Sequence, residues 1–272
     1  MKCLKWIAAI ALSASSVTAF AADIPATTIM DNYIGAGYSG DVYGSKSSYD
    51  IDKMTVSRTG AILSVDIFTS FYNNIGESGI RLGDLFMAAG DSNVWNPNDL
   101  ASDRFSQNNN KNNTGTNWEY ALDLGSETGS RKTYGGNSAW LRSVSANDLK
   151  DSNKFHGDSS RKHQVVMMGN NTAATNYGYS SWSMGGIAYT KEGINYGALS
   201  FTMDVTGTAL ETANQIAFRW AMSCANDIIE GLVSVAPTGA GGNQANASVP
   251  EPETILLMLI GMAGIAYRRK IS

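Results

Sequence analysis

Cysteine and histidine are scarce in this chain, and their scarcity removes several classes of site. The sequence has two cysteines, Cys3 and Cys224, and two histidines, His156 and His163. Cys3 precedes the apolar stretch of the N-terminus and is predicted to leave with it, so a single cysteine remains and an intramolecular disulfide is excluded. A zinc site is disfavoured because too few nitrogen and sulfur ligands are left. Stability must therefore come from a hydrophobic core.

The chain also lacks the signatures of common hydrolases. It has no Gly-x-Ser-x-Gly elbow, and both histidines lie in the polar run 150–164, so a Ser-His-Asp triad is not indicated. Carboxylates are present, yet no spacing selects two of them for glycoside hydrolysis. Cys224 ends an apolar alternation and is predicted to be a buried small hydrophobic residue. We expect no enzymatic activity and no cofactor, with a secreted hydrolase kept as the second alternative.

Charged residues are few, and both terminal segments of the chain are basic. Lys and Arg number 20 against 24 Asp and Glu, which gives a formal net charge of −4. Because the two terminal segments carry Lys2, Lys5 and the basic run 268–270, the body between them is more acidic than the whole chain. An acidic surface repels phosphate backbones, so we expect no nucleic-acid partner. Cations or neutral polymers such as polysaccharide suit this surface better.

The N-terminus has the three parts of a secretory signal peptide. Lys2 and Lys5 form the basic start, the run from Trp6 to Val17 is apolar, and Ala19-Phe20-Ala21 supplies small residues at the cleavage position. The apolar run is shorter than the ~20 residues that a membrane span needs. Residues 1–21 are therefore predicted to be a signal helix that is cleaved off, and the protein is expected to be exported through the inner membrane.

The C-terminus combines three elements in order. Pro250, Glu251 and Pro252 come first, the apolar stretch from Ile255 to Tyr267 follows, and Arg268, Arg269 and Lys270 come after it. An apolar helix of this length covers only about two thirds of a bilayer core, and the basic residues beside it favour the cytoplasmic side of the inner membrane. The preceding residues 237–249 are rich in Gly, Ala and Asn and predict a flexible linker.

This order closely resembles the PEP-CTERM sorting signal of Gram-negative bacteria, here over residues 250–272. The resemblance covers only about the last two dozen residues, but it is specific because three elements occur in sequence at the extreme C-terminus. It implies recognition by an exosortase, an integral-membrane protease-transpeptidase. It further implies removal of the tail, release or attachment at the cell surface, and association with the exopolysaccharide or biofilm layer.

The body, residues 22–236, shows the period-two alternation of half-buried strands. The runs Leu63–Phe71, Trp118–Leu124, Leu199–Val205 and Ile216–Met222 all carry it. A shorter run around Met54 is separated from the first of these by Arg58-Thr59-Gly60, which predicts a hairpin. We expect an all-β body, an antiparallel β-sandwich or jelly roll, with the signal helix before it and a separate short apolar helix after it.

The alternation also predicts which side chains are buried. Six apolar residues should be mostly buried: Leu63, Val65, Ile67, Phe218, Trp220 and Met222. Their neighbours Ser64, Asp66 and Arg219 should be more exposed, because alternate residues of a strand point to opposite faces.

Two groups of residues are candidates for ligand binding. Asp84, Asp91, Asp99 and Asp103 come within one loop-like segment and offer the oxygen ligands that Ca²⁺ takes, although their spacing matches no EF-hand and a solvated acidic loop is the competing interpretation. Asp227 and Glu230 form a similar pair, interpretable as a surface patch. Trp95 and Trp182 have polar, loop-like surroundings and are candidates for stacking on a sugar ring.

The leading hypothesis is an exported, non-enzymatic surface or matrix protein that works with extracellular polysaccharide. A carbohydrate-binding module is the alternative, and solvent-exposed aromatic side chains would distinguish it. A cleft with paired carboxylates, or a nucleophile beside a histidine, would favour the hydrolase.

Overall fold

The computed structural model describes residues 23–31, 42–75, 79–96, 116–125, 135–152, 164–169 and 175–234. The chain divides into two units, Met1–Thr238 and Gly239–Ser272, and every described residue belongs to the first. The predicted signal helix, linker and C-terminal helix lie outside the described residues. Within the described ranges, no helix combines the length and the apolar character that crossing a membrane requires.

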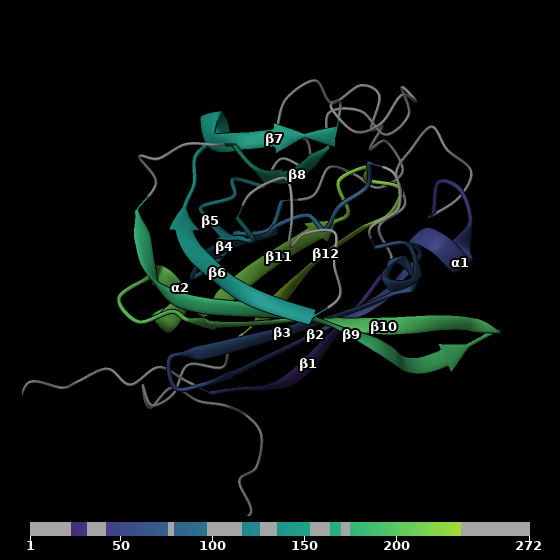
Figure 1. The fold of residues 1–272 in the computed structure, drawn as a ribbon. Coiled ribbons are helices and arrows are strands. Elements are labelled where there is room, and N and C mark those ends of the chain that lie inside the picture. The colour runs from purple at the N-terminus through teal and green to yellow at the C-terminus, as the bar shows by residue number, and fades with distance from the viewer. Residues whose placement is uncertain are drawn as a thin grey trace, which may run out of the picture. The chain divides into compact units, whose positions relative to one another are not determined.

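Ten strands form one antiparallel sheet in the order β1-β2-β3-β10-β9-β6-β5-β4-β11-β12 (Figure 1). Their bounds are β1 Ile24–Met30, β2 Ile51–Thr59, β3 Ile62–Thr69, β4 Leu85–Gly90, β5 Tyr120–Asp123, β6 Gly135–Ser143, β9 Asn176–Lys191, β10 Ile194–Asp204, β11 Gln215–Ala221 and β12 Ile228–Ser234. A second, two-stranded sheet pairs β7 Leu149–Asp151 with β8 Val165–Met168.

Helical structure is limited to single turns in the described part of the chain. The two short α-helices are α1 Lys46–Tyr49 and α2 Ala209–Thr212, and the 3₁₀ turns are η1 Ser70–Asn74 and η3 Ala146–Asp148. The expectation of an antiparallel, all-β body is therefore confirmed.

The large sheet rolls up until it is nearly closed. Its two end strands approach each other at Gly231 of β12, where a Cβ atom would lie only 2.4 Å from Cγ2 of Ile29 on β1. The pairing of β9 with β10 shifts register on both sides of Gly197, and such bulges bend and twist a sheet. The strands thus form one continuous sheet and not the two separate sheets of the expected sandwich, because long β9 and β10 join its two halves.

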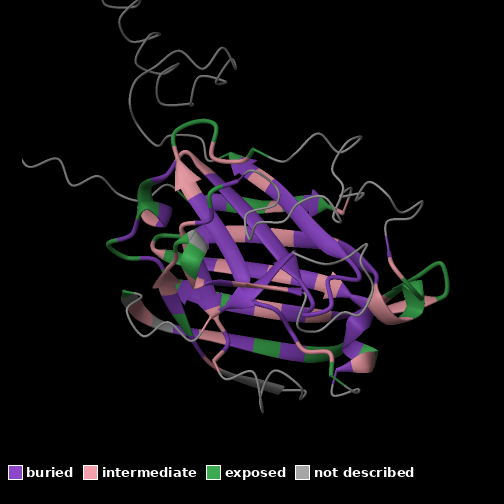
Figure 2. Cartoon of the chain, turned by 90° about the horizontal axis from the view of Figure 1, so that it is seen from above, coloured by how far each residue is buried: buried purple, intermediate pink, exposed green. Residues whose placement is uncertain are grey.

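The inner faces of the strands pack into the main core, as the alternation predicts. All six residues expected to be buried are fully so, and Cys224 is 2% exposed within the same core. Ser64 and Asp66 are half-buried on the other face of β3. The predicted hairpin is confirmed: Thr59 of β2 pairs with Ile62 of β3, and Gly60 in the turn has a positive φ of 55°. Figure 2 shows the alternation as bands of colour along the strands.

A second core lies on the outside of β4, β5 and β11. There Phe86 of β4 and Ala217 of β11 pack with Leu149 of β7 and Val165 of β8. This layer explains why one burial prediction is wrong. Arg219 of β11 is fully buried, because the outward face of its strand is covered by β8 instead of water.

Candidate functional site

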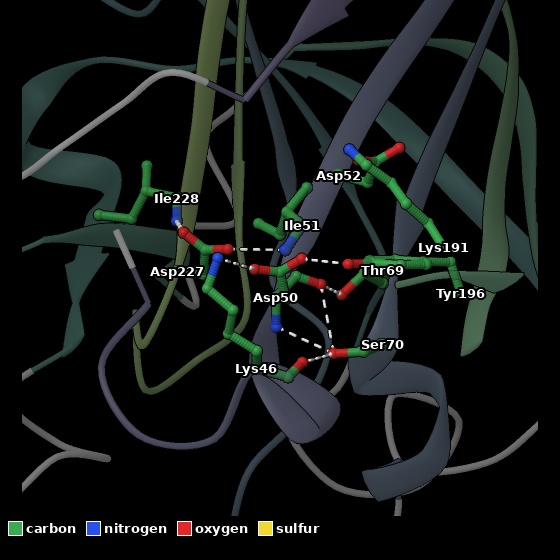
Figure 3. A network of polar contacts seen from close by, with 10 residues as sticks. All are labelled: Lys46, Asp50, Ile51, Asp52, Thr69, Ser70, Lys191, Tyr196, Asp227 and Ile228. Atoms are coloured by element: carbon green, nitrogen blue, oxygen red, sulfur yellow. Dashed lines mark hydrogen bonds and ion pairs between the residues drawn. The ribbon is translucent and has the colours of Figure 1, made fainter. Parts of the chain in front are cut away.

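Two carboxylates at the start of β2 hold the turn end of the β9–β10 hairpin (Figure 3). The hydroxyl of Tyr196 donates to Oδ2 of Asp50 at 2.5 Å, and Nζ of Lys191 donates to Oδ1 of Asp52 at 2.5 Å. The hydroxyl of Tyr189 donates to the other oxygen of Asp52. We call these five residues the Asp50–Asp52 clamp. Each carboxylate is more than 130 residues from its partners in the sequence, so the clamp fixes the β9–β10 hairpin to the start of β2.

The backbone beneath the clamp is fixed on both sides of Asp50. The Asp50 amide donates to Oγ of Ser70 at 2.9 Å, and its carbonyl accepts from the Thr69 hydroxyl at 2.8 Å. The Ile51 amide donates to Oδ2 of Asp227 at 2.6 Å. Because each of these bonds is buried, the backbone that carries the two carboxylates is held in a fixed position.

A polar cavity of about 250 Å³ opens beside the clamp. Its lining includes Asp31 from the end of β1, Lys46 from α1 and Glu192 from the hairpin turn, besides residues of the clamp. Lys46 lies 3.8 Å from Asp50, with its side chain 64% exposed. The lining mixes both signs of charge and offers hydrogen-bond donors and acceptors, which suits a small polar group better than an apolar one.

The pKa values of the two clamp carboxylates are shifted in opposite directions. Burial raises the pKa of Asp50 above its ordinary value of 3.8, against the lowering effects of the Tyr196 hydrogen bond and the Lys46 charge. Burial also acts to raise the pKa of Asp52, but hydrogen bonds from Lys191 and Tyr189 outweigh it, and the pKa falls below 3.8. Burial and then the bonded carboxylates raise the pKa of both tyrosines, so they remain donors.

These directions give a test of the clamp. Asp52 favours folding at pH values above 3.8, and its contribution is lost as the pH falls through its lowered pKa. Asp50 has the opposite sign, because its raised pKa favours the folded state at low pH and this contribution is lost as the pH rises. We expect Lys191→Met to raise the pKa of Asp52 and to move acid unfolding to higher pH, measured by carboxyl ¹³C NMR titration and circular dichroism. Lys46→Met is the matched control and should raise the pKa of Asp50 alone.

An aromatic array borders the clamp on the outside of the sheet. The rings of Phe68 and Tyr189 are 5.4 Å apart, and those of Tyr189 and Tyr196 are stacked at 5.3 Å. Nζ of Lys53 lies 5.0 Å from the Phe68 ring and 4.7 Å from the Tyr189 ring. The charge of Lys53 is therefore partly balanced by ring faces.

A buried polar network lies beneath the second core. Arg219 donates through Nη1 to Oε1 of Glu230, through Nη2 to Oε1 of Gln164 at 2.8 Å, and through Nε to the carbonyl of Val165 at 3.2 Å. Nε1 of Trp95 donates to the second oxygen of Glu230 at 3.2 Å. This network ties the segment before β8 and the residues after β4 to β11 and β12. The sequence analysis did not predict that Arg219 is buried and paired. Its position between the apolar residues Phe218 and Trp220 was the available indication.

The calcium hypothesis fails at Asp84. Asp84 is fully buried, and its two carboxylate oxygens accept from the backbone amides of Leu124 at 2.9 Å and Met168 at 2.7 Å. Asp91 is exposed beyond the far end of β4 and accepts from Asn214. Asp99 and Asp103 lie outside the described residues. In the described ranges, no three His, Cys, Asp or Glu side chains are grouped so that they could hold a metal ion.

The acidic pair Asp227 and Glu230 is also misplaced by the sequence reading. Both residues are buried, 0% and 5% exposed. The Asp227 carboxylate accepts from the amides of Ile51 and Ile228, and the Glu230 carboxylate accepts from Arg219. They are structural acceptors and not a surface patch.

Of the two candidate tryptophans, Trp182 is excluded from sugar stacking. It lies on β9 with 3% exposure in the main core, because the segment predicted to be a loop is a strand whose inward positions face that core. Trp95 is half-buried against the second core and bonded to Glu230. A cavity of about 310 Å³ is lined by its neighbours Val94 and Asn96, together with residues such as Glu119.

The residues of the sorting hypothesis, from Pro250 to Lys270, and both histidines lie outside the described residues. The comparison with known families decides the nature of the C-terminus, because the model of the PEP-CTERM protein-sorting motif matches residues 248–270. The chain carries a PEP-CTERM sorting motif. The motif implies export and processing by an exosortase, ending at the surface or outside the cell. No curated protein and no solved structure matches the chain.

Proposed function

We propose that this protein is a non-enzymatic component of the cell surface or extracellular matrix that associates with extracellular polysaccharide. Its PEP-CTERM motif is the observation that carries the proposal. In this proposal the signal peptide 1–21 directs export, the apolar stretch of the tail holds the chain in the inner membrane, and exosortase then removes the tail. In this proposal, proline on both sides of Glu251 disfavours a helix at the motif, which suits recognition of the segment by a protease.

The clamp supports a non-enzymatic role for the body. A general acid or base must exchange a proton with substrate, and a carboxylate nucleophile must have an oxygen that is free to attack the substrate. Each carboxylate of the clamp already accepts a bond from a tyrosine hydroxyl, and Asp52 also binds Lys191. These contacts favour a structural role, in which the two carboxylates connect β2 to the β9–β10 hairpin, over a role as a catalytic pair. The carbohydrate-binding alternative is favoured by a different surface, the outward side of strands β1, β2, β3, β10, β9 and β6.

The sorting step is tested by the mass of the protein in cells. The surface or secreted form should end near residues 250–253 and lack Arg268, Arg269 and Lys270. Deleting those three residues, or making Glu251→Gln, should trap full-length protein in the inner membrane, because the membrane stop or the recognised motif is lost. Glu253→Gln makes the same substitution just outside Pro-Glu-Pro and should be processed normally. Extracellular protein that keeps 268–270 would contradict the proposal.

A further inference from the structure

Among the described residues, a second layer covers one half of the outside of the rolled sheet and not the other half. The second core covers the outside of β4, β5 and β11. On β2, β3, β10 and β9, in contrast, the outward side chains along the strand centres are half-buried or exposed. We call the outward surface of β1, β2, β3, β10, β9 and β6 the outer face. Strands β1, β2, β3, β9 and β10 lie in the lower part of Figure 1, and β6 curves upward from them.

The strand register aligns small polar side chains across this face. One row runs through Thr28, Thr55, Asp66, Ser200 and Ser183, and the next through Ser57, Ser64, Thr202, Ser181 and Ser138. Each row crosses five strands, so at ~4.8 Å between strands it is about 19 Å long. Within the first row, the Ser200 hydroxyl donates to Asp66 at 2.5 Å. The two rows present an array of hydroxyl groups, with one carboxylate, in the middle of the outer face.

Apolar side chains flank these rows and do not occupy the centre. Met30 at one margin is 46% exposed, and at the opposite margin Ile62 is 44% and Trp140 38% exposed. These are three of the four large apolar side chains that are exposed in the described part of the chain. The guanidinium of Arg142 lies 5.9 Å from the Trp140 ring and pairs with Asp123 at 3.0 Å, which steadies this margin.

The outer face carries no excess charge, unlike the chain as a whole. Along the six strands, outward Lys53 and Arg142 match Asp66 and Asp204 in number, and Lys191 of β9 pairs with Asp52 of β2. Lys53 is also covered by two aromatic rings. A charged polymer or a metal ion therefore gains little attraction from this surface, whereas a neutral partner meets no repulsion.

We propose that the outer face binds a neutral polysaccharide chain, an inference that rests on the proposed function and assigns its binding surface. Protein interfaces place apolar and aromatic residues at the centre and polar residues at the rim. The outer face has the reverse order, which disfavours a second copy of the chain. Sugar hydroxyls exchange hydrogen bonds with the serine and threonine rows, and the exposed Trp140 ring offers an apolar face to the C–H groups of a sugar. Short hydroxyl side chains lose little rotamer freedom on binding, which lowers the entropic cost.

The test is native affinity electrophoresis of the processed protein in gels containing hydroxyethylcellulose, dextran or the anionic polymer alginate. We expect a neutral polymer to retard the wild type and alginate to leave its mobility unchanged. Trp140→Ala should weaken retention by about tenfold through loss of ring contacts. Ser64→Arg combined with Thr202→Arg should abolish retention, because two long cations then stand in one hydroxyl row. The matched control, Ser47→Arg with Thr212→Arg, adds the same charge at exposed positions of α1 and α2. Its retention, corrected for the mobility change that the added charge causes, should equal that of the wild type.

Three results would overturn the inference. They are equal retention of the row variant and its control, absence of retention in both neutral polymers, and a wild-type dimer in sedimentation velocity that the row variant dissociates. The last result would assign the face to self-association. Because processing depends on the C-terminal tail, every face variant should still lose that tail in cells. Equal retention of the row variant and its control, with normal processing, thus rejects only the outer face. Absence of wild-type retention in both neutral polymers also counts against association with neutral polysaccharide, whereas failure of processing with normal retention rejects the sorting step.

Discussion

Arg219→Leu is expected to lower the free energy of unfolding by about 3–5 kcal/mol, the usual effect of removing one partner of a buried ion pair. Both side chains of the Arg219–Glu230 pair are fully buried. Without the guanidinium, the Glu230 carboxylate loses its ion pair with Arg219 while it still accepts from the Trp95 indole, and a buried charge that loses its ion pair is costly. The bonds to Gln164 and Val165 are lost as well, so the attachment of β8 weakens together with the pair. Urea unfolding followed by tryptophan fluorescence measures the change.

A second variant separates the effect of charge from that of packing. Arg219→Leu combined with Glu230→Leu should recover a large part of the loss, because no unpaired carboxylate remains. Lys191→Met removes the lysine of a partly exposed ion pair, since the side chain of Lys191 is 49% exposed, and should cost far less. If Arg219→Leu proves no more harmful than Lys191→Met, the network contributes little to the attachment of the second core.

The strands of the main core could be predicted from the sequence because one of their faces is apolar and the other polar. In β3, inward Leu63 and Val65 alternate with outward Ser64 and Asp66, and the burial follows the pattern. The same rule is wrong at Arg219. Period two tells which residues share a face, but it does not tell whether another layer covers the second face. The covering strand β8 (Val165–Met168) lies far from β11 (Gln215–Ala221) in the sequence, so no local pattern around Arg219 predicts the cover.

The candidate sites show the same division between local and long-range information. The PEP-CTERM motif could be predicted because it is a linear order of residues that an enzyme reads directly. The Asp50–Asp52 clamp could not, because its partners lie 137, 139 and 146 residues apart in the sequence. Trp182 was misplaced because serine and glycine residues around it suggest a loop, whereas Ser181 and Ser183 are outward residues of β9 and belong to the hydroxyl rows.

Gly83→Ala is expected to cost at least the ~3 kcal/mol at the upper end of typical overpacking effects, and to reduce the yield of folded protein. A Cβ atom at this position would lie 1.9 Å from the carbonyl oxygen of Ala221 and 2.5 Å from that of Val166. Both obstacles are backbone atoms, so no side-chain rotation relieves the overlap. The space is closed because the indole of Trp220 donates to the Gly83 carbonyl at 3.2 Å, and the Asp84 amide donates to the Val166 carbonyl at 2.9 Å.

The matched control is Gly186→Ala on β9, where a Cβ atom would meet nothing within 4 Å and φ is not positive. That variant should be neutral or slightly stabilising, because alanine reduces the conformational entropy of the unfolded chain. Thermal unfolding of both variants gives the comparison. The large loss at Gly83 follows from its position between β11 and β8, where the backbones meet so closely that only a hydrogen fits. A Gly83→Ala protein as stable as the Gly186→Ala protein would mean that β8 can move away from β11 at little cost, and the buried Arg219 network would then have no fixed partner across that junction.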